Sequence, residues 1–183
     1  MAAPLNLLLA GFGGQGILFA GKLVAYAGLI EGRELSWLPS YGPEMRGGTA
    51  NCSVCLSDEP IGSPLVTEPD VLIAMNQPSL DKFIGDVAPG GVVIVDSTMV
   101  PSVPERADVT IHRVPATQLA EENGLKGLAN VILVGKLLSE IGFCCPSALE
   151  EAIKKSVPAK RQHLLEPNLQ ALALGMGTES CSV

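Results

Sequence analysis

The sequence predicts a three-layer α/β/α domain built on a mixed, mainly parallel sheet. Short apolar runs alternate along the chain with longer stretches of helical periodicity, which is the pattern of a layered α/β domain. Apolar residues make up 47% of the sequence and charged residues 17%, so the chain can bury a sizeable core. The 183 residues contain no internal repeat. We therefore expect a single domain over residues 1–176, followed by a flexible tail over residues 177–183.

The first half of the chain is expected to alternate strands with one helix. The apolar run over residues 5–10 predicts a strand, and a glycine-rich stretch after it leads into a predicted helix over residues 17–30. Small residues in this helix let it lie close to a sheet. Residues 35–38 predict a short strand and residues 49–56 another. Residues 39–48 fit neither period, and we expect an irregular segment there.

The second half is expected to begin with strands and to end with helices. Residues 71–75 predict a buried strand, and residues 79–87 a short helix. The turn Pro89-Gly90-Gly91 leads into residues 92–96, the most β-like run in the chain, and residues 109–114 predict a further strand. Three closing stretches with helical character cover residues 130–141, 147–157 and 158–174.

Charge and cysteine content narrow the class of protein. The formal net charge of −7 disfavours nucleic acid and anionic membranes as partners, because both attract clustered Lys and Arg. No apolar stretch is long enough to span a bilayer. Five cysteines without disulfide-framework spacing favour a cytoplasmic location. Cys52 and Cys55 lie in a predicted strand, so their side chains should point to opposite faces, and we expect no metal site.

A glycine-rich loop over residues 11–16 lies between a predicted strand and a predicted helix. In this context such a loop can bring N–H groups against a phosphate at a helix N-terminus. A dinucleotide site would also need an acid at the end of the second strand, but Glu34 is at its start and Pro39-Ser40 at its end. The glycines could instead serve only close strand–helix packing. The candidate binding residues of the loop are Gly11, Gly13, Gly14, Gln15 and Gly16.

A second unusual segment covers residues 40–51 and contains glycines, hydroxyl residues and a lone arginine. Such a loop is costly to order unless it lines a site or an interface. Arg46 can clamp a phosphate in a bidentate manner, or it can simply form an exposed ion pair with Glu44. The candidate binding residues of this segment are Arg46, Gly47, Gly48 and Thr49. No nucleophile, acid–base pair or metal cluster stands out elsewhere, so we predict no catalytic residue in this chain.

The two segments together resemble the gamma subunit of 2-oxoacid:ferredoxin (acceptor) oxidoreductases. The resemblance rests on GFGGQGILFAGKL from Gly11 and SYGPEMRGGTANCSV from Ser40, and it continues through residues 69–76. The family pattern also fits the β run that follows Pro89-Gly90-Gly91 and ends at Asp96. It fits the spacing of Asn168, Ala171 and Gly175 in the C-terminal helix as well. The glycine loop alone would be weak evidence for this family. The motifs together are strong evidence, because they cover essentially the whole chain.

The resemblance implies a role as one subunit of an enzyme that is not active alone. These enzymes decarboxylate a 2-oxoacid oxidatively on thiamine diphosphate, form acyl-coenzyme A and reduce ferredoxin through iron–sulfur clusters. The diphosphate cofactor belongs to the alpha and beta subunits, and the clusters to beta or to a small delta subunit. The gamma domain would face coenzyme A with its glycine loop, with Arg46 on a phosphate. The residues of the second segment, SYGPEMRGGTANCSV, favour 2-oxoglutarate or a branched-chain oxoacid over pyruvate as substrate.

Three other functions remain open from the sequence. The small subunit of an indolepyruvate oxidoreductase shares this domain, although Tyr41-Gly42-Pro43-Glu44 speaks somewhat against it. A stand-alone NAD(P)-binding oxidoreductase would need the acid that is missing from the second strand. A non-catalytic nucleotide-sensing or assembly module would have no enzymatic partner.

Overall fold

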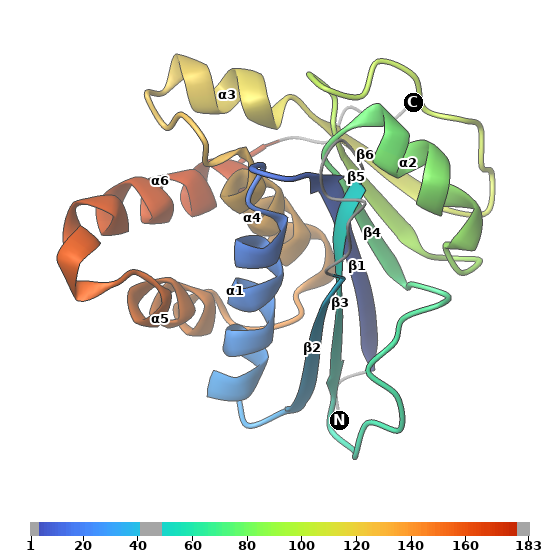
Figure 1. The fold of residues 1–183 in the computed structure, drawn as a ribbon, viewed down its shortest axis with the longest axis horizontal. Coiled ribbons are helices and arrows are strands. Elements are labelled where there is room, and N and C mark those ends of the chain that lie inside the picture. The colour runs from blue at the N-terminus through green and yellow to red at the C-terminus, as the bar shows by residue number, and fades with distance from the viewer. Residues whose placement is uncertain (1–3, 41–48, 179–183) are drawn as a thin grey trace.

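The computed structural model describes residues 4–40 and 49–178, which form one six-stranded sheet with helices on both faces (Figure 1). The strands are β1 (Leu5–Phe12), β2 (Glu34–Ser40), β3 (Thr49–Ser57), β4 (Val71–Ala74), β5 (Val92–Asp96) and β6 (Thr110–Val114). The α-helices are α1 (Ile17–Ile30), α2 (Gln77–Phe83), α3 (Ala116–Glu122), α4 (Ala129–Ile141), α5 (Pro146–Ser156) and α6 (Leu165–Met176). Two 3₁₀ helices are η2 (Ile84–Asp86) and η3 (Ala159–Leu164).

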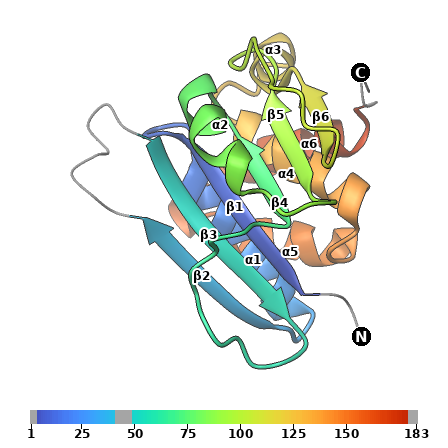
Figure 2. The ribbon, with the colours of Figure 1, turned by 90° about the vertical axis from the view of Figure 1, so that its right-hand side faces the viewer.

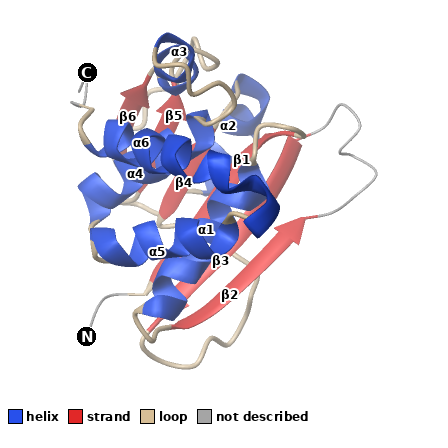
Figure 3. Ribbon diagram, turned by 90° about the vertical axis from the view of Figure 1, so that its left-hand side faces the viewer, coloured by secondary structure: helices blue, strands red, loops and turns tan. Residues whose placement is uncertain are grey.

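The sheet is mixed and mainly parallel, as predicted. Its strand order is β2-β3-β1-β4-β5-β6, and the neighbours β1, β4, β5 and β6 all run parallel. β3 lies antiparallel between β1 and β2. The helices α1, α4, α5 and α6 cover one face (Figure 3), and α2 covers the other (Figure 2). The two faces have separate apolar cores, so the predicted three layers are confirmed.

Most predicted elements are found, and the differences have local causes. α1 and β5 have the predicted bounds. α3 was not predicted; it is short and has no side-chain cap at its N-terminus, so it lacks the usual start signal. The closing helix is split into η3 and α6, and η3 is itself kinked at Arg161, whose backbone angles are not helical. Pro39 and Ser40, predicted to be irregular, belong to β2, where an edge strand tolerates a proline.

The helices α4 and α6 touch through their backbones. A Cβ atom on Gly175 would overlap the Ile132 carbonyl oxygen, and one on Gly135 would overlap the Leu172 carbonyl oxygen. Glycine at both positions therefore lets the two helix axes approach more closely than any side chain would permit. Gly177 and Thr178 continue from α6 with hydrogen bonds back to its last turn, and residues 179–183 lie outside the described part.

A charged cluster with buried Lys136 and His112 and the exposed Glu140 joins the end of α4 to β6. Lys136 is 2% exposed; its Nζ donates to the Thr178 carbonyl at 2.8 Å and lies 2.6 Å from Glu140 Oε1. Glu140 Oε2 is 3.5 Å from His112 Nε2 on β6. Burial lowers the pKa of the His112 imidazole; the Glu140 carboxylate opposes this shift and the Lys136 ammonium adds to it. The folded state therefore prefers a neutral His112.

This preference predicts a pH dependence of stability. Because the pKa of His112 is lower in the folded chain than in the unfolded chain, acidification protonates the unfolded state first. The free energy of unfolding should fall as the pH drops below about 6.5, by at most about 1.4 kcal/mol per pH unit for one proton. His112→Gln should lose this part of the slope between pH 7 and pH 5 in urea denaturation. An identical slope in the variant would contradict the assignment to His112, with the exposed His163→Gln as the control.

Candidate phosphate-binding site

The glycine loop lies where the direction of the chain connections changes across the sheet. After β1 the chain crosses to α1 on one face, and after the neighbouring parallel strand β4 it crosses to α2 on the other (Figures 2 and 3). In open α/β sheets, ligands bind in the crevice outside the carboxyl ends of the strands at such a switch point. The topology therefore places the loop of residues 11–16 where a ligand is expected.

The loop exposes a turn of backbone at the start of α1. Gly14 and Gly16 have φ angles of 94° and 77°, which L side chains adopt only with strain. The Gln15 N–H donates to the Phe12 carbonyl at 3.2 Å. Within residues 4–40 and 49–178, the N–H groups of Gly13, Gly14 and Gly16 form no hydrogen bond. Unpaired N–H groups at a helix N-terminus, which carries about half a positive charge, suit an anion.

The glycines of the loop are needed for different reasons. A Cβ atom on Gly11 would lie 2.7 Å from Ile17 Cδ1, and one on Gly16 would lie 2.5 Å from Asn130 Nδ2. These two positions serve close packing, as the packing hypothesis proposed. Among the described residues, a Cβ atom on Gly14 would meet nothing within 4 Å, so only its backbone conformation calls for glycine. No described residue therefore covers the loop at Gly14.

Two asparagines that sequence reasoning missed support the loop through hydrogen bonds to Gln15 and Gly16. Asn76, directly after β4, donates from Nδ2 to Gln15 Oε1 at 2.9 Å and accepts from the Ser79 N–H at the start of α2. Asn130, in the first turn of α4, donates to the Gly16 carbonyl at 3.0 Å. Asn76 could have been noticed, because Asn followed by Gln-Pro is typical of a helix N-cap. No local signal marks Asn130, which is 114 residues from Gly16.

The second candidate segment starts and ends beside the glycine loop. Ser40 at the end of β2 pairs with Asn51, and Thr49 at the start of β3 pairs with Phe12. The connection between these strands thus leaves and re-enters the sheet at the edge that carries the loop. The candidates Arg46, Gly47 and Gly48 lie outside the described residues.

The strand order adds a reason against a dinucleotide site. In a Rossmann fold the second strand lies next to the first, which brings its terminal acid to the ribose. Here β3 separates β2 from β1, and Glu34 is at the far end of β2 from the loop. The end of β2 holds Pro39 and Ser40, so neither the residue nor its position supports NAD(P).

Two of the described cysteines, Cys52 and Cys144, are buried thiols of low reactivity. Cys52 packs on the α1 side of β3, whereas Cys55 lies on the opposite face near the Ser63 carbonyl, as the alternation of a strand predicts. Burial raises the pKa of the Cys52 thiol to about 12, and that of Cys144 to about 12 as well. Thiols with such pKa values stay protonated and are weak nucleophiles and metal ligands. Among the described residues, no cluster of side chains with metal-binding geometry occurs.

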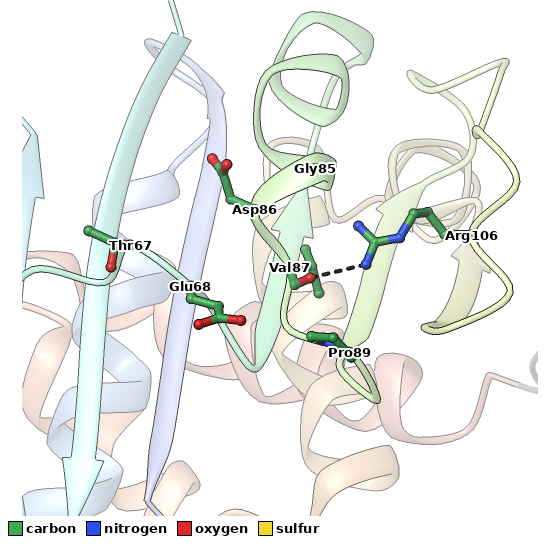
Figure 4. Close-up of a pocket in the computed structure, with 7 residues that line it drawn as sticks. All are labelled: Thr67, Glu68, Gly85, Asp86, Val87, Pro89 and Arg106. Atoms are coloured by element: carbon green, nitrogen blue, oxygen red, sulfur yellow. Dashed lines mark hydrogen bonds between the residues drawn. The ribbon is translucent and has the colours of Figure 1, made fainter.

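A surface pocket of about 440 Å³ lies away from the glycine loop, at the amino end of β5 (Figure 4). It is lined by Thr67, Glu68, Gly85, Asp86, Val87, Pro89 and Arg106. The Arg106 guanidinium donates to the carbonyls of Ile84 and Val87 at 2.7 and 3.1 Å and pairs with Asp108. The one arginine of this pocket thus ties the loop before β6 to η2, and it is not aimed at a ligand.

Fold and loop together define an open α/β domain with a glycine loop at its switch point. A family model described as pyruvate ferredoxin/flavodoxin oxidoreductase matches residues 6–178, and the chain belongs to this family. Within the described part, no helix has the length and apolar character needed to cross a membrane.

Two relatives differ in how much of their length this chain covers. The ketoisovalerate oxidoreductase subunit VorA of Methanothermobacter thermautotrophicus is 43% identical over 91% of this chain, which spans about a third (35%) of VorA. The 2-oxoglutarate synthase subunit KorC of Methanocaldococcus jannaschii is 40% identical over 93% of this chain and 91% of its own length. The match therefore corresponds to a whole subunit in one relative and to a part of a longer chain in the other.

Solved structures share the fold. The gamma subunit of a keto/oxoacid ferredoxin oxidoreductase from Geobacter sulfurreducens superimposes with a TM-score of 0.82 at 29% identity, covering 93% of this chain and 95% of that one. A 2-oxoglutarate:ferredoxin oxidoreductase from Magnetococcus marinus, solved with 2-oxoglutarate, coenzyme A and succinyl-CoA, has a TM-score of 0.83 at 24% identity. It is covered over 32% of its length, and this chain over 100%. The chain thus has the fold of the Geobacter sulfurreducens gamma subunit.

Proposed function

We propose that this chain binds the phosphates of coenzyme A within a 2-oxoacid:ferredoxin oxidoreductase. The observation that carries the proposal is the exposed turn at the switch point, where three N–H groups lie at the start of α1 without a partner in the described part. Gly13, Gly14 and Gly16 donate to a phosphate, while Gly11 and Gln15 shape the loop. Arg46, Gly47, Gly48 and Thr49 complete the site from the segment that ends beside it.

Coenzyme A fits this loop better than a dinucleotide does. Its ribose carries a 3′-phosphate, so the site needs donors and positive charge but no acid reserved for free ribose hydroxyls. The absence of such an acid from the end of β2, noted above, is then expected. The Magnetococcus marinus enzyme was solved with coenzyme A, which supports the same ligand class for this chain.

The chemistry of the reaction belongs to partner chains in this proposal. Alpha and beta subunits, with or without a delta subunit, supply thiamine diphosphate and the iron–sulfur clusters that pass electrons to ferredoxin. This chain holds and orients coenzyme A for the acyl transfer and takes part in assembly. The four cysteines of the described part are free thiols, which supports a cytoplasmic complex.

Two relatives support a substrate class for the complex. One is a ketoisovalerate enzyme subunit and the other belongs to a 2-oxoglutarate synthase, with 43% and 40% identity. We therefore assign oxidative decarboxylation of 2-oxoglutarate or of a branched-chain 2-oxoacid to the complex. Activity of the purified complex with each oxoacid, at saturating coenzyme A, distinguishes the two.

Arg46→Ala tests the coenzyme A assignment. Removing a charged partner of a phosphate costs about 1.5–3 kcal/mol, so KM for coenzyme A should rise at least about tenfold. The kcat and the KM for the oxoacid should stay close to those of the parent complex. Arg161→Ala, which removes an exposed arginine in η3, is the matched control.

Calorimetric titration with coenzyme A, NAD and FMN provides the independent measurement. Binding of coenzyme A that weakens in Arg46→Ala supports the proposal. An unchanged KM and an unchanged affinity in that variant would remove Arg46 from the site. Tight binding of NAD would overturn the assignment altogether.

A further inference from the structure

The side chain of Gln15 is turned away from the open side of the loop. Its Oε1 accepts from the Phe12 N–H at 2.6 Å and from Asn76 Nδ2 at 2.9 Å, and its Nε2 donates to the Met75 carbonyl at 2.9 Å. Phe12 ends β1, and Met75 and Asn76 directly follow β4. The side chain therefore links the glycine loop to the two strands on either side of the switch point.

Asn76 connects the same link to helix α2. It is 1% exposed, and its Oδ1 accepts from the Ser79 N–H at 2.9 Å while its Nδ2 donates to Gln15. A single buried amide thus caps α2 and fixes the orientation of Gln15. Both Oδ1 and Nδ2 of Asn76 thus bond to protein groups, so its role towards the loop is indirect.

A loop of this composition needs such support. Gly13 and Gly14 are exposed and carry no side chain, and glycine has more conformational freedom to lose than any other residue. If the loop were mobile, ligand binding would have to offset the conformational entropy that is lost when the loop becomes ordered. This cost is about 1–2 kcal/mol for each fixed residue. The three hydrogen bonds of the Gln15 side chain restrict the loop before any ligand binds.

We infer that Gln15, held by Asn76, is a positioning residue that pre-organises the N–H groups of the glycine loop for the phosphates of coenzyme A. The inference rests on the proposed function of this loop. Gln15 itself contacts the loop and the strands, not the ligand. Its removal should weaken coenzyme A binding and leave the chemical step intact, because that step belongs to other chains.

Gln15→Met tests the inference in the complex assembled with its partner subunits. Methionine keeps the length of the side chain and removes all three hydrogen bonds. KM for coenzyme A should rise about tenfold, because losing the three hydrogen bonds weakens ligand binding only through the order of the loop, while kcat and the KM for the oxoacid stay within twofold. Gln170→Met, at an exposed position of α6, is the matched control and should leave all three constants unchanged.

Hydrogen exchange gives a readout that does not depend on activity. In Gln15→Met the bonded N–H groups of Phe12 and Gln15 should exchange faster, and those of β5 and α4 should not. Asn76→Ser is the second variant: serine can still cap α2, but it is too short to reach Gln15. It should raise the same KM by about threefold and add little on top of Gln15→Met, since both act on one link.

The outcomes separate this inference from the proposed function. A raised KM in Arg46→Ala together with an unchanged KM in Gln15→Met would overturn the positioning role and leave the coenzyme A site standing. Unchanged KM values in both variants would overturn both. If Gln15→Met does not assemble, Asn76→Ser decides the matter in the same way.

Discussion

Replacing Gly16 by alanine should raise KM for coenzyme A by more than about tenfold and destabilise the chain by about 2 kcal/mol. Two effects combine at this residue. Its φ angle of 77° disfavours any L side chain, and the added methyl group would lie 2.5 Å from Asn130 Nδ2. Asn130 can withdraw only by giving up its hydrogen bond to the Gly16 carbonyl. The loop and the start of α1 would then shift together.

Gly124→Ala is the matched control for this prediction. Gly124 has a φ angle of 69°, and a Cβ atom there would meet nothing within 4 Å. The control therefore carries the backbone cost, about 1 kcal/mol, without the clash and without the loop. The kinetic constants should be unchanged. Equal effects of the two substitutions on KM would show that the loop does not take part in binding coenzyme A.

Gly175→Ala should destabilise the chain by about 3 kcal/mol or more, the largest effect on stability that we expect from one methyl group. The added Cβ atom would overlap the Ile132 carbonyl oxygen and lie 2.8 Å from the Ile132 carbonyl carbon. Both atoms are helix backbone and cannot rotate away. The helices α4 and α6 would have to separate, which opens the core between them.

Gly177→Ala provides the comparison only two residues further along. Among the described residues other than its chain neighbours, none would come closer than 3.6 Å to a Cβ atom at Gly177, so we expect a change within about 0.5 kcal/mol. Urea denaturation at neutral pH measures both variants, with the midpoint as the readout. A Gly175→Ala variant as stable as the parent chain would contradict the close approach of α4 and α6.

The sequence by itself determined the elements whose signals are local. Apolar periodicity located α1 and β5 at their observed bounds, and the glycine spacing marked the loop of residues 11–16. The composition and the two glycine-rich segments were enough to identify the family, which the family model confirms over residues 6–178. These features depend on neighbours within a few residues, so they can be read along the chain.

Contacts between residues far apart in the sequence are visible only in the tertiary structure. The insertion of β3 between β1 and β2 depends on strand pairing, which no local pattern encodes, and it removes the position of a dinucleotide-binding acid. The support of the glycine loop by Asn76 and Asn130 joins residues 61 and 114 positions apart. The backbone contact between α4 and α6 is of the same kind. Such contacts arise because packing brings together groups whose separation in sequence carries no signal, and hydrogen bonds then select among the arrangements that packing allows.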